Sequence, residues 1–335
     1  MENPTIKDVA QEAGLSAASI SLYLNNKPGL SDATRERIAR SIEKLGYVPR
    51  TQKMNHLTLI GLLVEKLPLS VFADIFYAEV VQGLESRARQ LGYQTVLMIS
   101  DSQENDGIPR AILEHQVEGL IALGGGDLTD ELISRISGNK IPVVLVDNYL
   151  LDGSVDCVLP DNVLGGYAAT NYLIEKGHKR IAVIMGPAKY KPLTDRMMGY
   201  TRALLEAGLR PDVELMQPSL SSGVPNKGYR EMQAILSRKE LPTAVFCVSD
   251  RTAIGALMAV KEAGLHVPED IALLGFDDTR DSEHTTPPLT TVRVPKLELG
   301  QVAIEQLDRR MDNRHSETPP LKLVLSTSLV ERASA

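Results

Sequence analysis

Three polar residues, Asp147, Ser249 and Asp277, lie where parallel β-strands are expected to end. A fourth, Arg196, is expected to open the helix that follows another strand. Ligands of open α/β sheets bind outside the carboxyl ends of the strands. Carboxylates accept hydrogen bonds and a guanidinium donates several in a fixed fork, so this set suits the hydroxyl groups of a sugar. We therefore predict a small polar ligand here. A helix cap is the competing role for a strand-end aspartate, and we prefer it for Asp250 and Asp278.

Signatures of catalysis are missing from the sequence. It contains no dinucleotide fingerprint, P-loop or nucleophile elbow, and its six histidines are scattered without metal-ligand spacing. The glycine triplet 124–126 lacks the GxGxxG order and is explained by a strand-to-helix turn. Cys157 and Cys247 lie far apart in apolar stretches, which indicates buried reduced thiols. The sequence predicts neither an enzyme nor a cofactor or metal site.

From about residue 58 onward, short aliphatic runs alternate with amphipathic stretches. This alternation is typical of parallel α/β sheets with helices on both faces. Buried strands are predicted at 59–64, 95–99, 119–123, 143–146, 181–185, 244–248 and 271–274. Helices are predicted at 78–91, 164–176 and 253–263, each followed by a glycine that can adopt the left-handed conformation closing a helix.

Two crossings divide this α/β core into two Rossmann-like lobes. The chain is expected to cross to a second lobe near 161–163 and to return along the proline-rich segment 287–295. The resulting core, 59–335, has a first lobe of about 59–160 and 294–322. Its second lobe is about 161–290 and 323–335.

The first fifty residues have a compact helical pattern. Thr5 and Ser16 are expected to cap two short helices, and a third runs from Arg35 to Leu45 behind Ser31. The interior positions of a helix-turn-helix match Val9, Ala13, Leu15, Ile20 and Tyr23. Its small-residue positions, where the helices approach and the backbone turns, match Ala10 and Gly14. This joint match favours a DNA-binding head at 1–50 over a three-helix bundle used for protein contacts.

The second helix of this head presents small and polar residues outward. Those predicted to face the major groove are Ser16, Ala17, Ala18, Ser19 and Ser21. Alanines can contact thymine methyl groups, and serines can hydrogen-bond a base edge or a phosphate. Further DNA contacts are predicted for Thr5, Leu22 and Asn25.

Charge and hydropathy exclude other classes of protein. The net charge of −7 excludes binding of nucleic acid by bulk charge, although residues 1–60 carry +2. The N-terminus lacks a basic, apolar leader, and no apolar run reaches the roughly 18 residues of a membrane span. We expect a cytoplasmic protein without membrane contact.

Several motifs resemble the lac repressor/galactose repressor family of regulators. In the head they are 5–10 (TIKDVA), 14–16 (GLS), 24–28 (LNNKP), 34–38 (TRERI) and 45–49 (LGYVP); in the core they are 175–181 (EKGHKRI), 275–278 (GFDD) and 288–292 (PLTTV). The resemblance implies a homodimeric repressor of palindromic double-stranded operator DNA. It also implies a core like type I periplasmic sugar-binding proteins, with a small effector between the lobes. In the family, residues matching Asp147, Arg196 and Asp277 contact the effector.

The sequence departs from the family in two places. Many members have an arginine that reads a guanine where this chain has Leu22, so direct base readout there must be apolar. The linker at 51–58 is short and lacks the hinge pattern Ala-Arg-x-Leu. Met54 and Leu57 are its candidates for an apolar wedge in the minor groove. We predict weaker DNA bending and a less effector-sensitive linkage than in relatives.

The four phenylalanines are predicted near the ligand. Phe72 and Phe76 fall at the first-lobe cleft mouth, whereas Phe246 and Phe276 lie beside Ser249 and Asp277. A ligand with an apolar face could stack on such rings, although packing inside a strand is the preferred role for Phe246. The long loop 65–74 either lids the effector or packs at the dimer face.

Two alternatives to a transcription regulator are an enzyme and a solute-binding protein. The sequence lacks the motifs of a Rossmann-type enzyme, and only turnover of a bound sugar would support that function. A solute-binding component of a transporter shares the core but needs export, which the missing leader and the N-terminal helices oppose.

Overall fold

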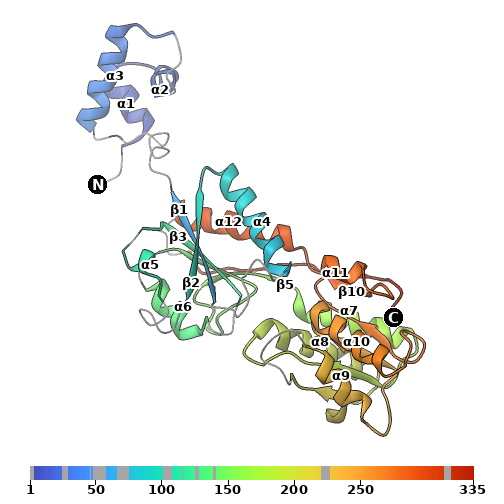
Figure 1. The fold of residues 1–335 in the computed structure, drawn as a ribbon. Helices are drawn as coiled ribbons and strands as arrows, with labels where there is room; N and C mark the ends of the chain where they lie inside the picture. The colour runs from blue at the N-terminus through green and yellow to red at the C-terminus, as the bar shows by residue number, and fades with distance from the viewer. Residues whose placement is uncertain are drawn as a thin grey trace. The chain divides into compact units, whose positions relative to one another are not determined.

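The computed structural model describes residues 4–24, 29–45, 47, 58–65, 75–100, 108–114, 116–124, 128–138, 141–219, 227–312 and 318–335. The chain divides into two compact units, Met1–Thr58 with Gly92–Gln94, and Leu59–Leu91 with Thr95–Ala335. Figure 1 labels their helices and strands. No helix among the described residues is long and apolar enough to cross a membrane.

Three helices form the head: α1 (Ile6–Ala13), α2 (Ala17–Leu24) and α3 (Asp32–Leu45). At the start of α1, Thr5 Oγ1 accepts from the Asp8 backbone amide and Asp8 accepts from that of Thr5. Gly14, at φ +60°, ends α1. The buried core consists of Val9, Ala10, Ala13, Ile20 and Ile38. Three of these five, Val9, Ala13 and Ile20, occupy interior positions expected of a helix-turn-helix, and Ala10 occupies one of its small-residue positions.

The first lobe is built on a six-stranded sheet with the strand order β11-β5-β4-β3-β1-β2. Its strands are β1 (Leu59–Glu65), β2 (Gln94–Ser100), β3 (Gly119–Leu123), β4 (Val143–Val146), β5 (Asp156–Pro160) and β11 (Lys322–Leu325). Its helices are α4 (Ile75–Gln90), α5 (Arg110–Leu113), α6 (Asp130–Ser137) and α12 (Lys296–Asp312). Figure 1 shows α4 and α12 together on one face and α5 and α6 on the other.

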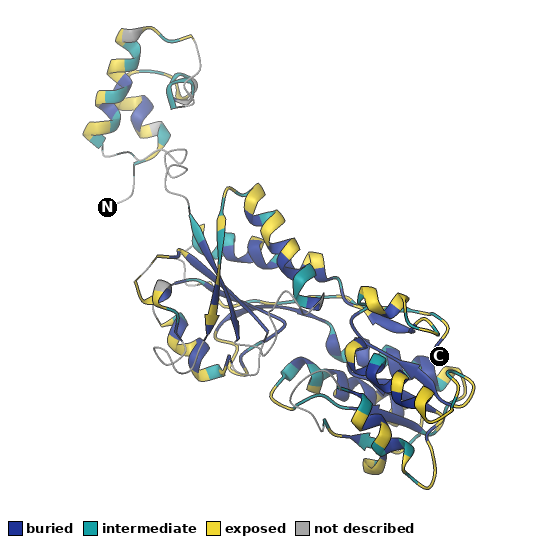
Figure 2. Cartoon of the chain, viewed as in Figure 1, coloured by how far each residue is buried: buried dark blue, intermediate teal, exposed yellow. Residues whose placement is uncertain are grey.

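The second lobe contains a four-stranded parallel sheet with the order β7-β6-β8-β9. Its strands are β6 (Ile181–Ile184), β7 (Met216–Gln217), β8 (Ala244–Cys247) and β9 (Ala272–Leu274). Its helices are α7 (Asn162–Glu175), α8 (Lys191–Glu206), the 3-10 turn η4 (Val213–Leu215), α9 (Tyr229–Leu236), α10 (Asp250–Glu262) and α11 (Arg280–Glu283). Figure 2 shows the strands buried and the outer helix faces exposed.

The expected strands match the observed ones within a residue, but the helix starts differ. Helices α7 and α10 begin two or three residues earlier than predicted because Asp161 and Ser249 cap them upstream. Near the C-terminus the polar residues 326–327 separate two further strands, β11 and β12 (Ser328–Val330). Strand β11 joins the first sheet, whereas β12 pairs with β10 (Thr291–Arg293). The expected lobe boundary at 322/323 therefore falls inside β11.

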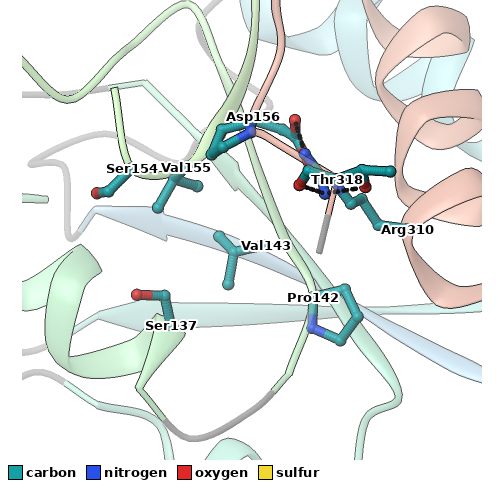
Figure 3. A pocket seen from close by; sticks show the side chains of 9 residues that line it. Ser137, Pro142, Val143, Ser154, Val155, Asp156, Arg310 and Thr318 are labelled. Atoms are coloured by element: carbon teal, nitrogen blue, oxygen red, sulfur yellow. Dashed lines mark hydrogen bonds and ion pairs between the residues drawn. The ribbon is translucent and has the colours of Figure 1, made fainter. Parts of the chain in front are cut away.

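A buried ion pair fastens α12 to the amino end of the first sheet. Asp156, 3% exposed, accepts two bonds from Arg310 and one from the Leu321 backbone amide at 2.6 Å. These groups border a cavity of about 270 Å³, shown in Figure 3. Because the cavity lies at the amino ends of β4 and β5, it is at the opposite edge of the sheet from Asp147.

Removing one partner of this pair should unfold the core more easily. We expect Arg310→Met to lower the free energy of unfolding by about 3–5 kcal/mol, since the Asp156 carboxylate stays buried without its counter-charge. Urea denaturation measures the change. The control is Arg202→Met, from an exposed i,i+4 pair with Glu206, where a loss under about 1 kcal/mol is expected. Equal losses in the two variants would contradict the structural role of Arg310.

Candidate ligand site and nucleic-acid interface

Asp147 lies directly after β4, at the carboxyl edge of the first sheet. Its φ of +54° turns the chain sharply, and the residue is 8% exposed. The Tyr77 hydroxyl donates to Oδ2 at 3.4 Å, whereas Oδ1 is buried without a hydrogen-bond partner in the described part of the chain. Burial raises the pKa of Asp147 to about 7; the positive charge of Arg196 opposes this rise and Asp277 adds to it.

Arg196, in the first half of α8, is held in place by several groups of the second lobe. Its Nε donates to Asn162 Oδ1 at 2.8 Å and its Nη1 to the Val248 carbonyl at 2.6 Å. Nη1 also lies 3.0 Å from Asp277 Oδ1. The guanidinium carbon is 3.8 Å from the centre of the Phe276 ring. Contacts from three separate elements therefore fix the guanidinium plane.

Close approach of α7 and α8 sets the position of Arg196 along its helix. A Cβ atom at Gly166 would lie 2.2 Å from the Arg196 carbonyl oxygen. One at Gly199 would lie 2.1 Å from the Val163 carbonyl oxygen. Only glycine permits this distance between the two backbones.

Adding one methyl group at Gly166 tests this packing. Alanine normally stabilises a helix by about 1 kcal/mol relative to glycine, but here α8 must move away, so we expect Gly166→Ala to destabilise the protein by about 1–3 kcal/mol. Thermal denaturation measures the effect. Gly138→Ala is the control, because Gly138 is right-handed and a Cβ there meets atoms no closer than 3.4 Å. A more stable Gly166→Ala protein would show that the helices can separate freely.

Asp277 lies in a tight turn after β9, at φ +116°. Its amide donates to the Val292 carbonyl at 2.8 Å, and the buried Lys296 ammonium donates to its carbonyl at 2.7 Å. The next residue, Asp278, pairs with Arg293 and Arg332. These bonds hold the Asp277 carboxylate beside Arg196.

The two aspartates predicted to be helix caps do not cap a helix, since the N-cap residues of α10 and α11 are Ser249 and Thr279, but both have partners within the protein. Asp250 is fully buried and accepts from Thr291 Oγ1 at 2.5 Å and the Thr279 amide at 2.7 Å. Burial, reinforced by the charge of Asp277, raises the pKa of Asp250 to about 7. Burial of Asp278 is outweighed by bonds from Arg293 and Arg332, which lower its pKa. Both carboxylates thus stabilise the turn that carries Asp277.

Of the predicted effector residues, the structure brings Asp147, Arg196 and Asp277 together. Ser249 caps α10, accepting from the Thr252 amide at 3.3 Å. Its contact with a ligand stays a prediction. Phe72 lies outside the described residues.

The burial of Phe246 and Phe276 leaves neither ring exposed for a ligand to stack on, whereas the ligand contact of Phe76 stays a prediction. Phe246 and Phe276 are fully buried, and the Arg196 guanidinium covers one face of Phe276. Phe76 is 8% exposed and packs edge-on against Tyr77 at 5.1 Å. The rings that remain half-buried at the lobe junction belong to tyrosines 77, 149 and 190.

Several groups at the lobe junction were not predicted from the sequence. Lys191 Nζ donates to Asp130 Oδ1 and to the Tyr149 carbonyl, both at 2.5 Å. The Tyr149 hydroxyl donates to Asp195 at 3.0 Å. Nδ2 of Asn162 is buried without a partner among the described residues. The strand-end rule that identified Asp147 could also have found Glu65, the last residue of β1.

Helix α2 of the head exposes the start of the predicted recognition surface. Ser16 accepts from the Ser19 amide at 3.1 Å and so caps the helix, and Ser16, Ala17 and Thr5 are exposed. Leu22 and Ser19 are half-buried. The side chains of Ala18 and Ser21, and residues Asn25, Met54 and Leu57, lie outside the described structure.

Comparison with known proteins assigns this architecture. Residues 5–50 match the model of bacterial regulatory proteins of the lacI family, and residues 170–335 match that of the periplasmic binding protein-like domain. The transcriptional repressor PurR of Erwinia tasmaniensis is 36% identical over 342 residues, covering 98% of this chain and 96% of PurR. The chain belongs to the lacI family of bacterial regulators. The resemblance inferred from the motifs is therefore confirmed.

Solved structures of the family have the same fold. The complex of the regulator CelR with cellobiose has a TM-score of 0.75 at 32% identity, covering 99% of this chain and 100% of CelR. The lac repressor dimer bound to operator and the anti-inducer ONPF has a TM-score of 0.71 at 26% identity, covering 99% of both chains. The predicted helix-turn-helix head and two-lobed core are confirmed. As a lacI-family member, the protein is a DNA-binding regulator rather than an enzyme.

Proposed function

We propose that this lacI-family protein is a repressor whose homodimer binds a palindromic operator and responds to a small effector, a sugar or sugar derivative. The effector binds between the two lobes of the core, against Asp147, Arg196 and Asp277. No cofactor takes part. The protein acts in the bacterial cytoplasm, on the nucleoid when bound to DNA.

The arrangement of Arg196 carries this proposal. Its guanidinium is 2% exposed and lies beside a second-lobe carboxylate, Asp277, while its charge acts on a first-lobe carboxylate, Asp147. One cation between acceptors from both lobes can donate to a ligand whose own hydroxyl groups donate to the carboxylates. A ligand bound in this way contacts both lobes and can shift the equilibrium between different arrangements of the two lobes.

Two relatives support the chemistry and the assembly. CelR, at 32% identity, is seen in complex with cellobiose, a carbohydrate. The lac repressor, at 26% identity, is seen as a dimer on operator DNA. A symmetric dimer presents two recognition helices, so its operator should contain two inverted half-sites about one turn apart.

Selection from random duplexes tests the DNA side of the proposal. Purified full-length protein should enrich a palindrome with two half-sites separated by about 10 base pairs or a multiple. Enrichment of an unpaired site, or of no sequence at all, would contradict the proposed homodimeric repressor.

The short linker leads to a separate prediction about DNA shape. Because the hinge pattern is missing from 51–58, we expect the operator complex to show little bend in circular-permutation gels. Fragments with the site at their centre and at their end should migrate alike. A strong position-dependent shift, or a minor-groove kink in a co-crystal, would show that Met54 or Leu57 acts as a wedge.

A further inference from the structure

We propose that Glu65, Tyr77 and Asp147 form an acidic wall that selects an uncharged or cationic effector rich in hydrogen-bond donors and rejects phosphorylated or carboxylated ones. This inference rests on the proposed effector function and specifies the class of ligand. It concerns the first-lobe side of the site. Glu65 and Tyr77 were not among the residues predicted from the sequence.

Strand register places the two carboxylate residues in one row. Strands β1, β3 and β4 are parallel, and their paired residues end with the row Val64, Leu123 and Val146. The residues that continue this row are Glu65, Gly124 and Asp147. Since neighbouring strands are about 4.8 Å apart, the two acidic residues are separated by about 10 Å, with glycine between them. That spacing can accommodate a ligand bearing several hydroxyl groups.

Tyr77, near the start of α4, places its hydroxyl over the glycine in this row. A Cβ atom on Gly124 would lie 2.8 Å from the Tyr77 hydroxyl oxygen, and Gly124 has a φ of +77°. The same hydroxyl donates to Asp147 Oδ2. From the second lobe, the Tyr190 hydroxyl donates to Glu65 Oε1 at 3.3 Å. Both carboxylates therefore lie within reach of groups from other elements.

An unsatisfied acceptor in this wall points to a ligand. Asp147 is more than nine-tenths buried, and its Oδ1 has no partner among the described residues. Buried polar atoms are almost always hydrogen-bonded, so this oxygen offers an acceptor for a donor that the described residues do not supply, as a bound ligand would. A hydroxyl or ammonium group supplies a donor. An ionised phosphate or carboxylate supplies only acceptors and additional negative charge.

The charges around Asp147 favour the same class of ligand. The groups that act on it are Arg196 and Tyr77, which favour its ionised form, and Asp277 and Asp195, which oppose it. The one cation in this set is already beside Asp277. Lys191, the nearby ammonium at the start of α8, is bound to Asp130. An anionic ligand would therefore add a further negative charge to a site that already holds Asp147, Asp195 and Asp277.

Matched ligands differing in charge test the selection. Thermal shift and calorimetry on the full-length protein should compare glucose, glucosamine and glucose 6-phosphate, ribose and ribose 5-phosphate, and cellobiose. We expect every binder to be uncharged or cationic, with its phosphorylated counterpart at least tenfold weaker. A phosphorylated sugar that binds as tightly as its parent overturns the wall but leaves the proposed effector function standing. Binding of none of them counts against the proposed carbohydrate effector, and the ligand-free test then decides on the wall.

The ligand-free protein provides that second test. Asp147→Asn removes a buried charge whose Oδ1 has no hydrogen-bond partner among the described residues, so the midpoint of thermal unfolding of this variant at pH 8 should be unchanged or higher. Asp156→Asn, which breaks the pair with Arg310, should lower the midpoint by several degrees. A comparable loss in Asp147→Asn would identify Asp147 as a structural group and overturn the proposal. For any compound that binds, the ratio of the dissociation constants of its phosphorylated and unphosphorylated forms should be smaller in Glu65→Gln than in the original protein. An unchanged ratio would show that Glu65 does not belong to the wall.

Discussion

Ala17→Glu will abolish tight operator binding while leaving the head folded. Ala17 is exposed in the first turn of α2, directly after the Ser16 cap. An acidic residue in the first turn of a helix is stabilising, so the free protein should lose no stability. At the DNA surface the same carboxylate meets phosphates and base edges. A defect of about 1–3 kcal/mol at each head, doubled in the dimer, lowers affinity on the order of 100-fold or more.

Fluorescence anisotropy with the selected operator measures this loss, and circular dichroism melting checks the fold. The matched control is Gln11→Glu, which adds the same charge to an exposed position in the last turn of α1. We expect Gln11→Glu to bind the operator within a few-fold of the original protein. If Ala17→Glu binds as well as the control, α2 does not read the operator.

Arg196→Met should strongly destabilise the core and abolish effector binding. It removes the bonds to Asn162 and the Val248 carbonyl and leaves the Asp277 carboxylate buried without its counter-charge. Breaking a buried pair from one side costs about 3–5 kcal/mol in the free energy of unfolding. Because the guanidinium is also the proposed ligand donor, effector binding should be lost in any variant that remains folded.

A double-mutant cycle separates the cost of leaving the Asp277 carboxylate unpaired from the cost of losing the other contacts of Arg196. Adding Asp277→Asn to Arg196→Met should recover part of the stability, because no buried charge then remains unpaired in this pair. Arg293→Met serves as the control, since Arg293 is 55% exposed and Asp278 keeps its bond to Arg332. Its cost should stay under about 1 kcal/mol. Strictly additive losses in the cycle would mean that Arg196 and Asp277 do not depend on each other.

The parts of the fold that could be predicted are those set by local sequence. Helical periodicity identifies Val9, Ala13 and Ile20 as core residues of the head, and aliphatic runs locate β3 and β4 to the residue. Strand β5 was missed because it begins with Asp156 and ends with a proline. A buried aspartate in a strand is acceptable only with a partner, and that partner, Arg310, is 154 residues away.

The candidate site shows the same division between local and distant information. Asp147 and Asp277 could be predicted because each directly follows an apolar run, and Arg196 because it was expected to open a helix, although α8 begins at Lys191. The row from Glu65 to Asp147 depends on strand order and register, which a single sequence does not encode locally. Stacking on Phe276 was wrongly expected because sequence proximity to Asp277 does not reveal that Arg196 covers the ring.

Binding of an effector to the core is expected to change the affinity of the head for its operator. The operator dissociation constant of the full-length protein should be determined with and without a compound that raises its thermal midpoint. We expect the dissociation constant to change at least tenfold, corresponding to a coupling free energy of about 1.4 kcal/mol or more. A compound that binds the core but leaves the operator dissociation constant unchanged would contradict this expectation.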